Sequence, residues 1–195
     1  MPSDLQVTNI KANDGTAGLV IADSSGQVTG TLGSATVFPA HHIIQIIQAT
    51  NTTQKIVTGT WEATSFSVTI TPSATSSKIL IMAGIQLMTR RSSSADAGDA
   101  EGKCKIYSNG AAGGDGSGTF AGVSNEQKLR GYDYGTTGAS PDGLLLNTVL
   151  AVNWLDSPSL DVPIIYKIYV KHQTGEDTRF NDGGGSTMTL MEVAG

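Results

Sequence analysis

The sequence predicts an all-β protein, an antiparallel β-sandwich or jelly roll with an extended, β-rich N-terminal arm. Apolar and polar residues alternate in segments such as residues 66–71, where Phe66, Val68 and Ile70 share one side, as in a half-buried strand. Turn sequences rich in Gly, Pro, Asn and Asp separate these segments. No stretch of ten or more residues gives a convincing helix, so packed sheets are the expected architecture.

Eight segments have the composition of strands, because they are rich in β-branched or aromatic residues and end at turn sequences. The first also fits a helical stripe through Ile43, Ile46 and Ile47, but it is short and a polar turn follows, so we expect a strand. Two segments rich in glycine and charge, 90–102 and 109–143, are predicted to be surface loops, the second with short strands around Phe120 and Leu129. The predicted strands are residues 42–50, 55–61, 66–71, 78–88, 103–107, 145–154, 163–170 and 187–193.

Two of these segments, 78–88 and 163–170, have apolar residues on both faces. A sandwich of two sheets covers only one face of each sheet. These strands therefore indicate that a further surface covers the second face.

The chain divides by composition into an arm, residues 1–36, and a head, residues 37–195. In the arm, single apolar residues stand between Gly, Asp, Asn, Ser and Thr, too dispersed to close a core of their own. We expect this arm to be ordered only against sister subunits or other partner proteins, with its contacts made by Leu5, Val7, Ile10, Leu19 and Ile21.

The composition argues against several classes of function. The net charge is −5 and Arg90-Arg91 is the only adjacent basic pair, so nucleic acid is not an expected partner. The longest mostly apolar run has ten residues, 79–88, so we expect no membrane insertion. The N-terminus has no readable secretory signal. A single cysteine, Cys104, excludes an intrachain disulfide and is expected to be a small buried side chain.

No catalytic motif stands out, and we expect neither an enzyme nor a cofactor. His41 and His42 cannot easily reach one ion within one chain, since neighbours on a strand point to opposite faces. In a three-fold assembly a single His facing the axis would appear three times and could bind a metal ion or an anion, although packed or hydrogen-bonded histidines are the expected alternative. The cluster Asp96, Asp99 and Glu101 lacks the spacing of a calcium loop and is expected to be a solvated acidic loop. Glycines at 113–118 precede neither a lysine nor a helix, which argues against phosphate binding.

Aromatic and charged residues gather at two places that are predicted to be loops. Tyrosine beside Asp, Asn and Arg is suited to saccharide or protein recognition, because flat rings stack and polar partners fix orientation. Anchoring of the loops is the alternative role. The candidates for recognition are Tyr132, Asp133 and Tyr134 in the first group and Arg179, Phe180 and Asp182 in the second.

The order of motifs along the chain resembles the virion fibre proteins of tailed phages, especially those of marine hosts such as cyanophages. The resemblance covers an arm of short apolar positions and turns, Pro39-Ala40, Gln45, the stretch 69–80, and Met191-Glu192. His41 departs from the pattern, which has a glycine there. The resemblance implies a homotrimer with a jelly-roll head similar to the trimeric heads of complement C1q and tumour-necrosis-factor proteins.

The function that this resemblance implies is that of a virion structural protein, assembled in the cytoplasm of the host bacterium. The first reading is a short trimeric tail fibre or tail-tip protein that attaches to other virion proteins through its arm and presents loops to a host-surface saccharide or protein. A capsid decoration, cement or head-fibre protein is the second reading. A carbohydrate-binding or depolymerase protein is the third, although no catalytic site supports a depolymerase.

Overall fold

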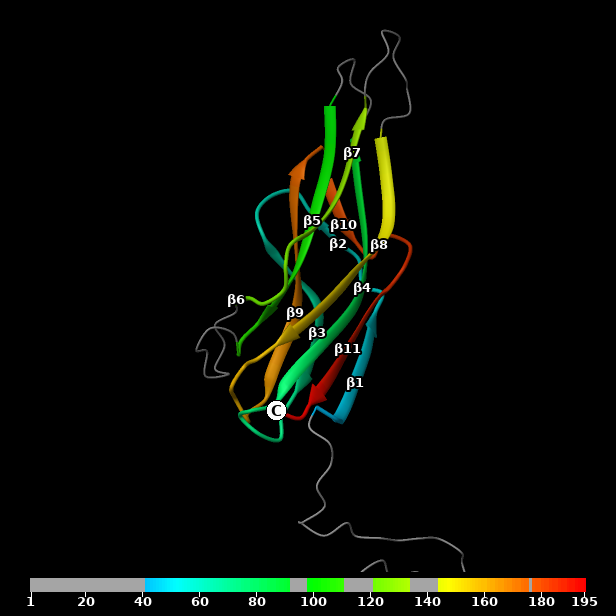
Figure 1. The fold of residues 1–195 in the computed structure, drawn as a ribbon. Coiled ribbons are helices and arrows are strands. Elements are labelled where there is room, and N and C mark those ends of the chain that lie inside the picture. The colour runs from blue at the N-terminus through cyan, green and yellow to red at the C-terminus, as the bar shows by residue number, and fades with distance from the viewer. Residues whose placement is uncertain (1–40, 92–97, 111–120, 134–143, 176) are drawn as a thin grey trace, which may run out of the picture. The chain divides into compact units, whose positions relative to one another are not determined.

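The computed structural model describes residues 41–91, 98–110, 121–133, 144–175 and 177–195 (Figure 1). All regular elements in these residues are strands, which confirms the predicted all-β class. The strands are β1 Ile43–Asn51, β2 Lys55–Val57, β3 Glu62–Ile70, β4 Lys78–Arg91, β5 Gly98–Ser108, β6 Ala121–Gly122, β7 Gln127–Asp133, β8 Leu144–Asp156, β9 Ile164–Thr174, β10 Asp177–Phe180 and β11 Ser186–Val193.

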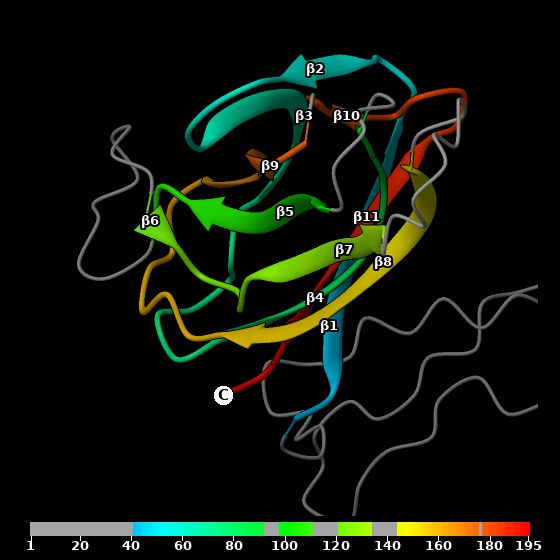
Figure 2. The ribbon, with the colours of Figure 1, turned by 90° about the horizontal axis from the view of Figure 1, so that it is seen from above.

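The strands form two antiparallel sheets that face each other (Figure 2). In sheet 1, the long strand β4 pairs with β8 along one side. Along its other side β4 pairs first with β11 and then with β10, and β1 and β2 lie beyond these two. In sheet 2, β9 lies between β3 and β5, and β6 and β7 pair with the far side of β5. The sandwich that the alternation predicts is thus confirmed.

Alternate side chains of both sheets fill the space between them. In β4 the odd-numbered positions from Ile79 to Leu87 point inward, and in β9 the even-numbered ones from Ile164 to Val170 do so. Burying a large aliphatic or aromatic side chain contributes roughly 1.5–3 kcal/mol each. The largest fully buried side chains are Tyr166, Phe180, Ile70, Ile79, Ile81, Ile85, Leu87, Met88, Ile106, Ile164, Ile168 and Met188.

Several local expectations can be compared with the strands. The segment predicted as residues 42–50 forms a strand, β1 (Ile43–Asn51), and not a helix, as expected, since β1 pairs with β11. The predicted loop 90–102 is wrong at both ends, because β4 continues to Arg91 and β5 begins at Gly98. Strand β10 was not expected; only four residues long, it pairs with both β4 and β2.

Two glycines allow the backbone to pass closely around β10. Gly175, before β10, has φ 106°, and a Cβ there would lie 2.6 Å from the carbonyl oxygen of Arg90. A Cβ on Gly102 of β5 would lie 2.6 Å from Cγ2 of Thr178. Because real Cβ atoms do not approach so closely, both positions need glycine for this packing.

Three other predictions concern single positions. His41 has φ 66°, the left-handed conformation that glycine favours, which agrees with the glycine expected there. Cys104 is fully buried in β5, and burial raises the pKa of its thiol to about 12. The arm residues Leu5, Val7, Ile10, Leu19 and Ile21 lie outside the described residues, so their role and the boundary at residue 36 stay predictions.

Candidate functional site

The outer face of sheet 1 carries a broad apolar surface, formed by the strands β1, β11, β4 and β8. Residues that pair across these strands share the face, so the register gives its rows. One row is apolar throughout and runs Ile46, Met191, Leu80, Leu155. We call this surface the apolar face; it consists of Ile43, Ile46, Leu80, Met82, Val149, Leu155, Met191 and Val193.

The apolar face has one charged side chain at its border, Lys78, which lies in the row of Val193 and Ile43. The other outward positions between the levels of Lys78 and Arg90 on these four strands are Gln48, Thr50, Gly84, Gln86, Met88, Asn147, Ala151, Asn153, Thr187 and Thr189. Ile46 and Val149 are each 58% exposed and Leu155 is 50% exposed. Monomeric soluble proteins rarely expose contiguous apolar patches larger than a few hundred Å². The apolar face therefore has the character of a protein contact surface.

At Gly84 and Ala151, no long side chain projects from this face. Gly84 of β4 has no side chain, and a Cβ there would meet Cγ1 of Val149 at 3.2 Å. Its neighbour across the strands on β8 is Ala151. A flat sheet surface suits contact with another flat surface, because neither partner needs to open a pocket.

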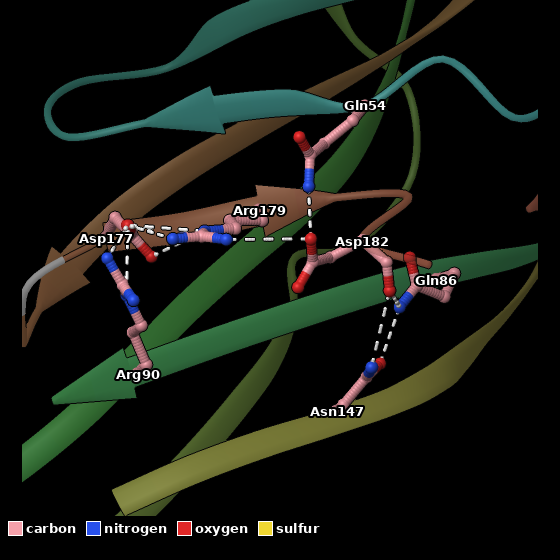
Figure 3. Close-up of polar contacts among 7 residues, drawn as sticks. All are labelled: Gln54, Gln86, Arg90, Asn147, Asp177, Arg179 and Asp182. Carbon is pink, nitrogen blue, oxygen red and sulfur yellow. Dashed lines mark hydrogen bonds and ion pairs between the residues drawn. The ribbon is translucent and has the colours of Figure 1, made fainter. Parts of the chain in front are cut away.

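A polar cluster adjoins the apolar face where β10 and β2 replace β11 and β1 beside β4 (Figure 3). Arg179 of β10 donates to Asp177 at 3.2 Å and its guanidinium lies 3.6 Å from the carboxylate of Asp182. Arg90 of β4 also pairs with Asp177, at 3.2 Å. The hydrogen bond to Asp177 raises the pKa of Arg179. These charges are compensated within the cluster.

Two amide side chains join the cluster to β8. Nε2 of Gln86 donates to Oδ1 of Asn147 at 2.5 Å and to the carbonyl oxygen of Asp182 at 3.2 Å. Gln54 donates to the carboxylate of Asp182. Gln86 is 5% exposed, and its Oε1 is buried without a hydrogen-bond partner. The sequence analysis missed Gln86 and Asn147, since neither amide belongs to a recognisable motif.

Asn181 holds the cluster's loop in place. Its Nδ2 donates to the carbonyl and side-chain oxygens of Asn51, at 2.8 and 3.0 Å, and its Oδ1 accepts from Ser186 at 2.7 Å. Its backbone has φ 56°, which asparagine tolerates better than most residues. Asn181 is 2% exposed and so acts as a structural anchor.

Replacing Asn181 with alanine is expected to lower the free energy of unfolding by about 3 kcal/mol, because buried partners lose their bonds and the left-handed backbone becomes strained. Asn181→Gly separates the two causes, because it removes the same hydrogen bonds but glycine adopts the left-handed backbone without strain. It should therefore lower the free energy of unfolding by less than Asn181→Ala does. Urea unfolding at a fixed protein concentration measures both. A loss below about 1 kcal/mol for Asn181→Ala would contradict the anchoring role.

The structure separates the residues that were predicted to serve recognition. Arg179 and Asp182 belong to the polar cluster on sheet 1, whereas Tyr132, 48% exposed, lies on the outer face of sheet 2. Phe180 is fully buried in the core, so it cannot present its ring to a receptor. Asp133 is the last residue of β7, and Tyr134 lies outside the described residues. The expectation of recognition loops is thus wrong for Tyr132, Arg179 and Phe180, which lie in strands.

The weak candidates for ions gain no support from geometry. No group of three or more His, Cys, Asp or Glu residues in the described part of the chain could hold a metal. His41 is exposed and His42 half-buried, at the start of β1. Asp99 and Glu101 lie in strand β5, where they pair with Arg130 and Lys103, so the expectation of a solvated acidic loop is wrong for these two. Asp96 and residues 113–118 lie outside the described residues.

Comparison with known proteins gives similarity to solved structures but not to curated proteins or family models. No protein-family model matches the chain, and no curated protein matches it. Among solved structures, the fold is similar to part of the VP2 subviral particle of infectious bursal disease virus, with a TM-score of 0.36 and 15% identity over 77% of this chain. The match covers 33% of the VP2 chain, so this chain spans about a third of that protein. In the described residues no helix is long and apolar enough to cross a membrane.

Proposed function

We propose that this chain is a virion structural protein of a tailed phage, a short homotrimeric tail fibre or tail-tip protein that attaches through residues 1–36. The observation that supports the proposal is the apolar face of sheet 1. A surface of this kind is costly to leave in water, at about 25 cal/mol per Å² of apolar area. Further copies of the chain are the proposed cover.

A second copy suits the apolar face for two reasons. In a closed trimer the same residues of all three subunits meet near the three-fold axis, and apolar residues there bring no like charges together. The apolar face is also bordered by the polar cluster, whose Arg179 and Asp182 are partly exposed. An apolar centre with a polar rim is the usual composition of a stable protein interface.

The same fold suits a second role, as a capsid decoration, cement or head-fibre protein, and the apolar face does not distinguish the two. The position of the protein on the virion does. A depolymerase would need a catalytic site, and nothing in the sequence motifs supports that third role.

The proposal predicts that the purified chain has three times its 20.1 kDa mass in light scattering, and that gold-labelled antibody marks the tail of intact virions. A monomer mass would refute the trimer. Label spread over the shell would replace the tail assignment with the decoration role. A chain absent from purified virions would overturn the virion role altogether.

A further inference from the structure

Three lysines lie in one row across the outer face of sheet 2. Lys128 of β7 pairs with Lys103 of β5, which pairs on its other side with Lys171 of β9. Like charges directly opposite each other destabilise a sheet. Lys103 is neutralised by Glu126 at 2.8 Å and by Glu101 at 3.3 Å. No carboxylate of the described residues pairs with Lys128 or Lys171. The positive charges at the two ends of the row are therefore not balanced by a neighbouring carboxylate.

Aromatic rings lie beside this lysine row. The rings of Tyr107 and Tyr169 are 4.1 Å apart between centroids and tilted by 35°. Trp61 adds a third ring, 6.2 Å from Tyr107. Along the strands, Lys105 is opposite Tyr169 and Lys167 is opposite Tyr107, so rings and amines alternate. All three rings are half-buried, which holds them as a fixed platform with part of their surface in solvent.

The neighbouring strand β3 adds a line of hydroxyl groups. Ser65, Ser67 and Thr69 are exposed on the same face, and Ser67 is opposite Lys167. At the other side of the face, Lys128, Arg130 and Tyr132 occupy the outward positions of β7. Arg130 pairs with Asp99 and Glu101 of the adjacent strand. The outer face of sheet 2 therefore presents rings, hydroxyls and a few uncompensated amines.

Rings, hydroxyl groups and sparse amines together suit one class of polyanion better than another. Nucleic acid carries a phosphate at every nucleotide and is bound by clusters of uncompensated basic residues. Here Glu101, Glu126 and Asp99 neutralise part of the basic charge, so what remains is sparse. Sugar rings stack their apolar faces on aromatic side chains, their hydroxyls bond to Ser and Thr, and a carboxylate on some of the sugars would meet isolated amines.

We propose that the outer face of sheet 2 binds a polysaccharide that carries carboxylate groups, with Lys128 and Lys171 as the anion contacts and Tyr107 and Tyr169 as the stacking platform. The inference rests on the proposed function in one respect, since it names the class of host-surface ligand. Lys128 and Lys171, which no carboxylate of the described residues neutralises, would be compensated by the carboxylates of such a ligand.

The test measures binding of the full-length protein to alginate and to polygalacturonate by titration calorimetry, with dextran as the uncharged control and oligothymidylate as the nucleic-acid control. The double variant Lys128→Gln/Lys171→Gln is expected to weaken binding to the acidic polysaccharides about tenfold or more. Its thermal midpoint should stay close to that of the wild type, because neither lysine pairs with a carboxylate of the described residues. The single variant Lys171→Gln is compared with Lys78→Gln, which removes the same charge from sheet 1 and should leave binding unchanged. Light scattering checks that both variants keep the wild-type mass, because Lys78 pairs with Val193 of the apolar face.

Each result has a definite meaning. Failure of both acidic polysaccharides to bind would overturn the proposal, as would tighter binding of oligothymidylate. Equal loss of affinity in Lys78→Gln would show attraction by net charge and would overturn the site. A lowered thermal midpoint in the double variant would assign the lysines a structural role instead. Because these assays use only the purified protein, they can fail while the virion assignment holds, and the reverse.

Discussion

Replacing Val149 with lysine is expected to leave a folded 20.1 kDa monomer in place of the trimer that we propose for the wild-type chain. Val149 is 58% exposed and lies on the apolar face beside the small residue Gly84. A lysine there would place an unpaired charge within the proposed interface, where burial of the charge is costly. We expect a loss of about a thousandfold or more in association, which light scattering over a dilution series measures.

A matched substitution distinguishes loss of the interface from a general effect of added charge. Thr69 is an exposed strand residue on sheet 2, and Thr69→Lys adds the same charge to the opposite layer. It should leave the trimer intact. The interface would be misplaced if Val149→Lys kept the mass of the wild type, or if Thr69→Lys dissociated the trimer equally.

Glu192 is the second position where a large effect is expected, this time on folding. Its carboxylate is fully buried and accepts from Nε2 of Gln45 and from the backbone and hydroxyl of Ser73, each at 2.6 Å, and from the hydroxyl of Ser77 at 2.7 Å. Burial alone would raise the pKa of this carboxyl, but the hydrogen bonds lower it to about 2. The carboxylate thus ties the turn between β3 and β4 to β11 and β1.

The low pKa of Glu192 makes stability depend on acidity. Because the folded pKa is below the ordinary value of 4.5, the ionised group stabilises the fold above pH 4.5, and this contribution is lost as the pH falls from there through about 2. The shift corresponds to about 3 kcal/mol. Glu192→Gln should lower the free energy of unfolding at pH 7 by about that amount and flatten its fall between pH 4.5 and 2.

Denaturant unfolding across this pH range, at a fixed protein concentration, compares the two chains. Glu62, whose carboxylate is partly exposed and pairs with Lys55, gives a control through Glu62→Gln. That variant should keep the acid dependence of the wild type, because the exposed pair contributes little. The same acid dependence in Glu192→Gln as in the wild type would rule out Glu192 as its source.

The strands were predictable where their side chains face two different environments. Alternation in residues 66–71 and the apolar run 78–88 follow from burial between the sheets, a property that each residue type expresses locally. Strand β10 could not be found in this way. Its residues Asp177, Thr178 and Arg179 are polar, and it exists because β4 and β2 flank it on both sides. Pairing between distant segments overrides local preference there.

The candidate sites were less predictable, because they depend on which strands become neighbours. The apolar residues on the second face of residues 78–88 predicted that a further surface covers this strand. In the structure this second face is part of the apolar face. The lysine row was invisible, since Lys103, Lys128 and Lys171 come from three separate segments and meet only through the register of β7, β5 and β9. Phe180 was misjudged because its polar neighbours suggested an exposed loop, whereas alternation along β10 turns its ring inward.

The two sheets are opposite layers of one sandwich (Figure 2), and this has a consequence for strength of attachment. A trimer joined through sheet 1 would carry three lysine rows directed away from its axis. A long polymer that reached two of them at once would convert its second contact into an intramolecular event. Such multivalent engagement can raise the overall affinity by 10²–10⁴ without any new contact. Weak single sites on sheet 2 would then suffice for firm adhesion.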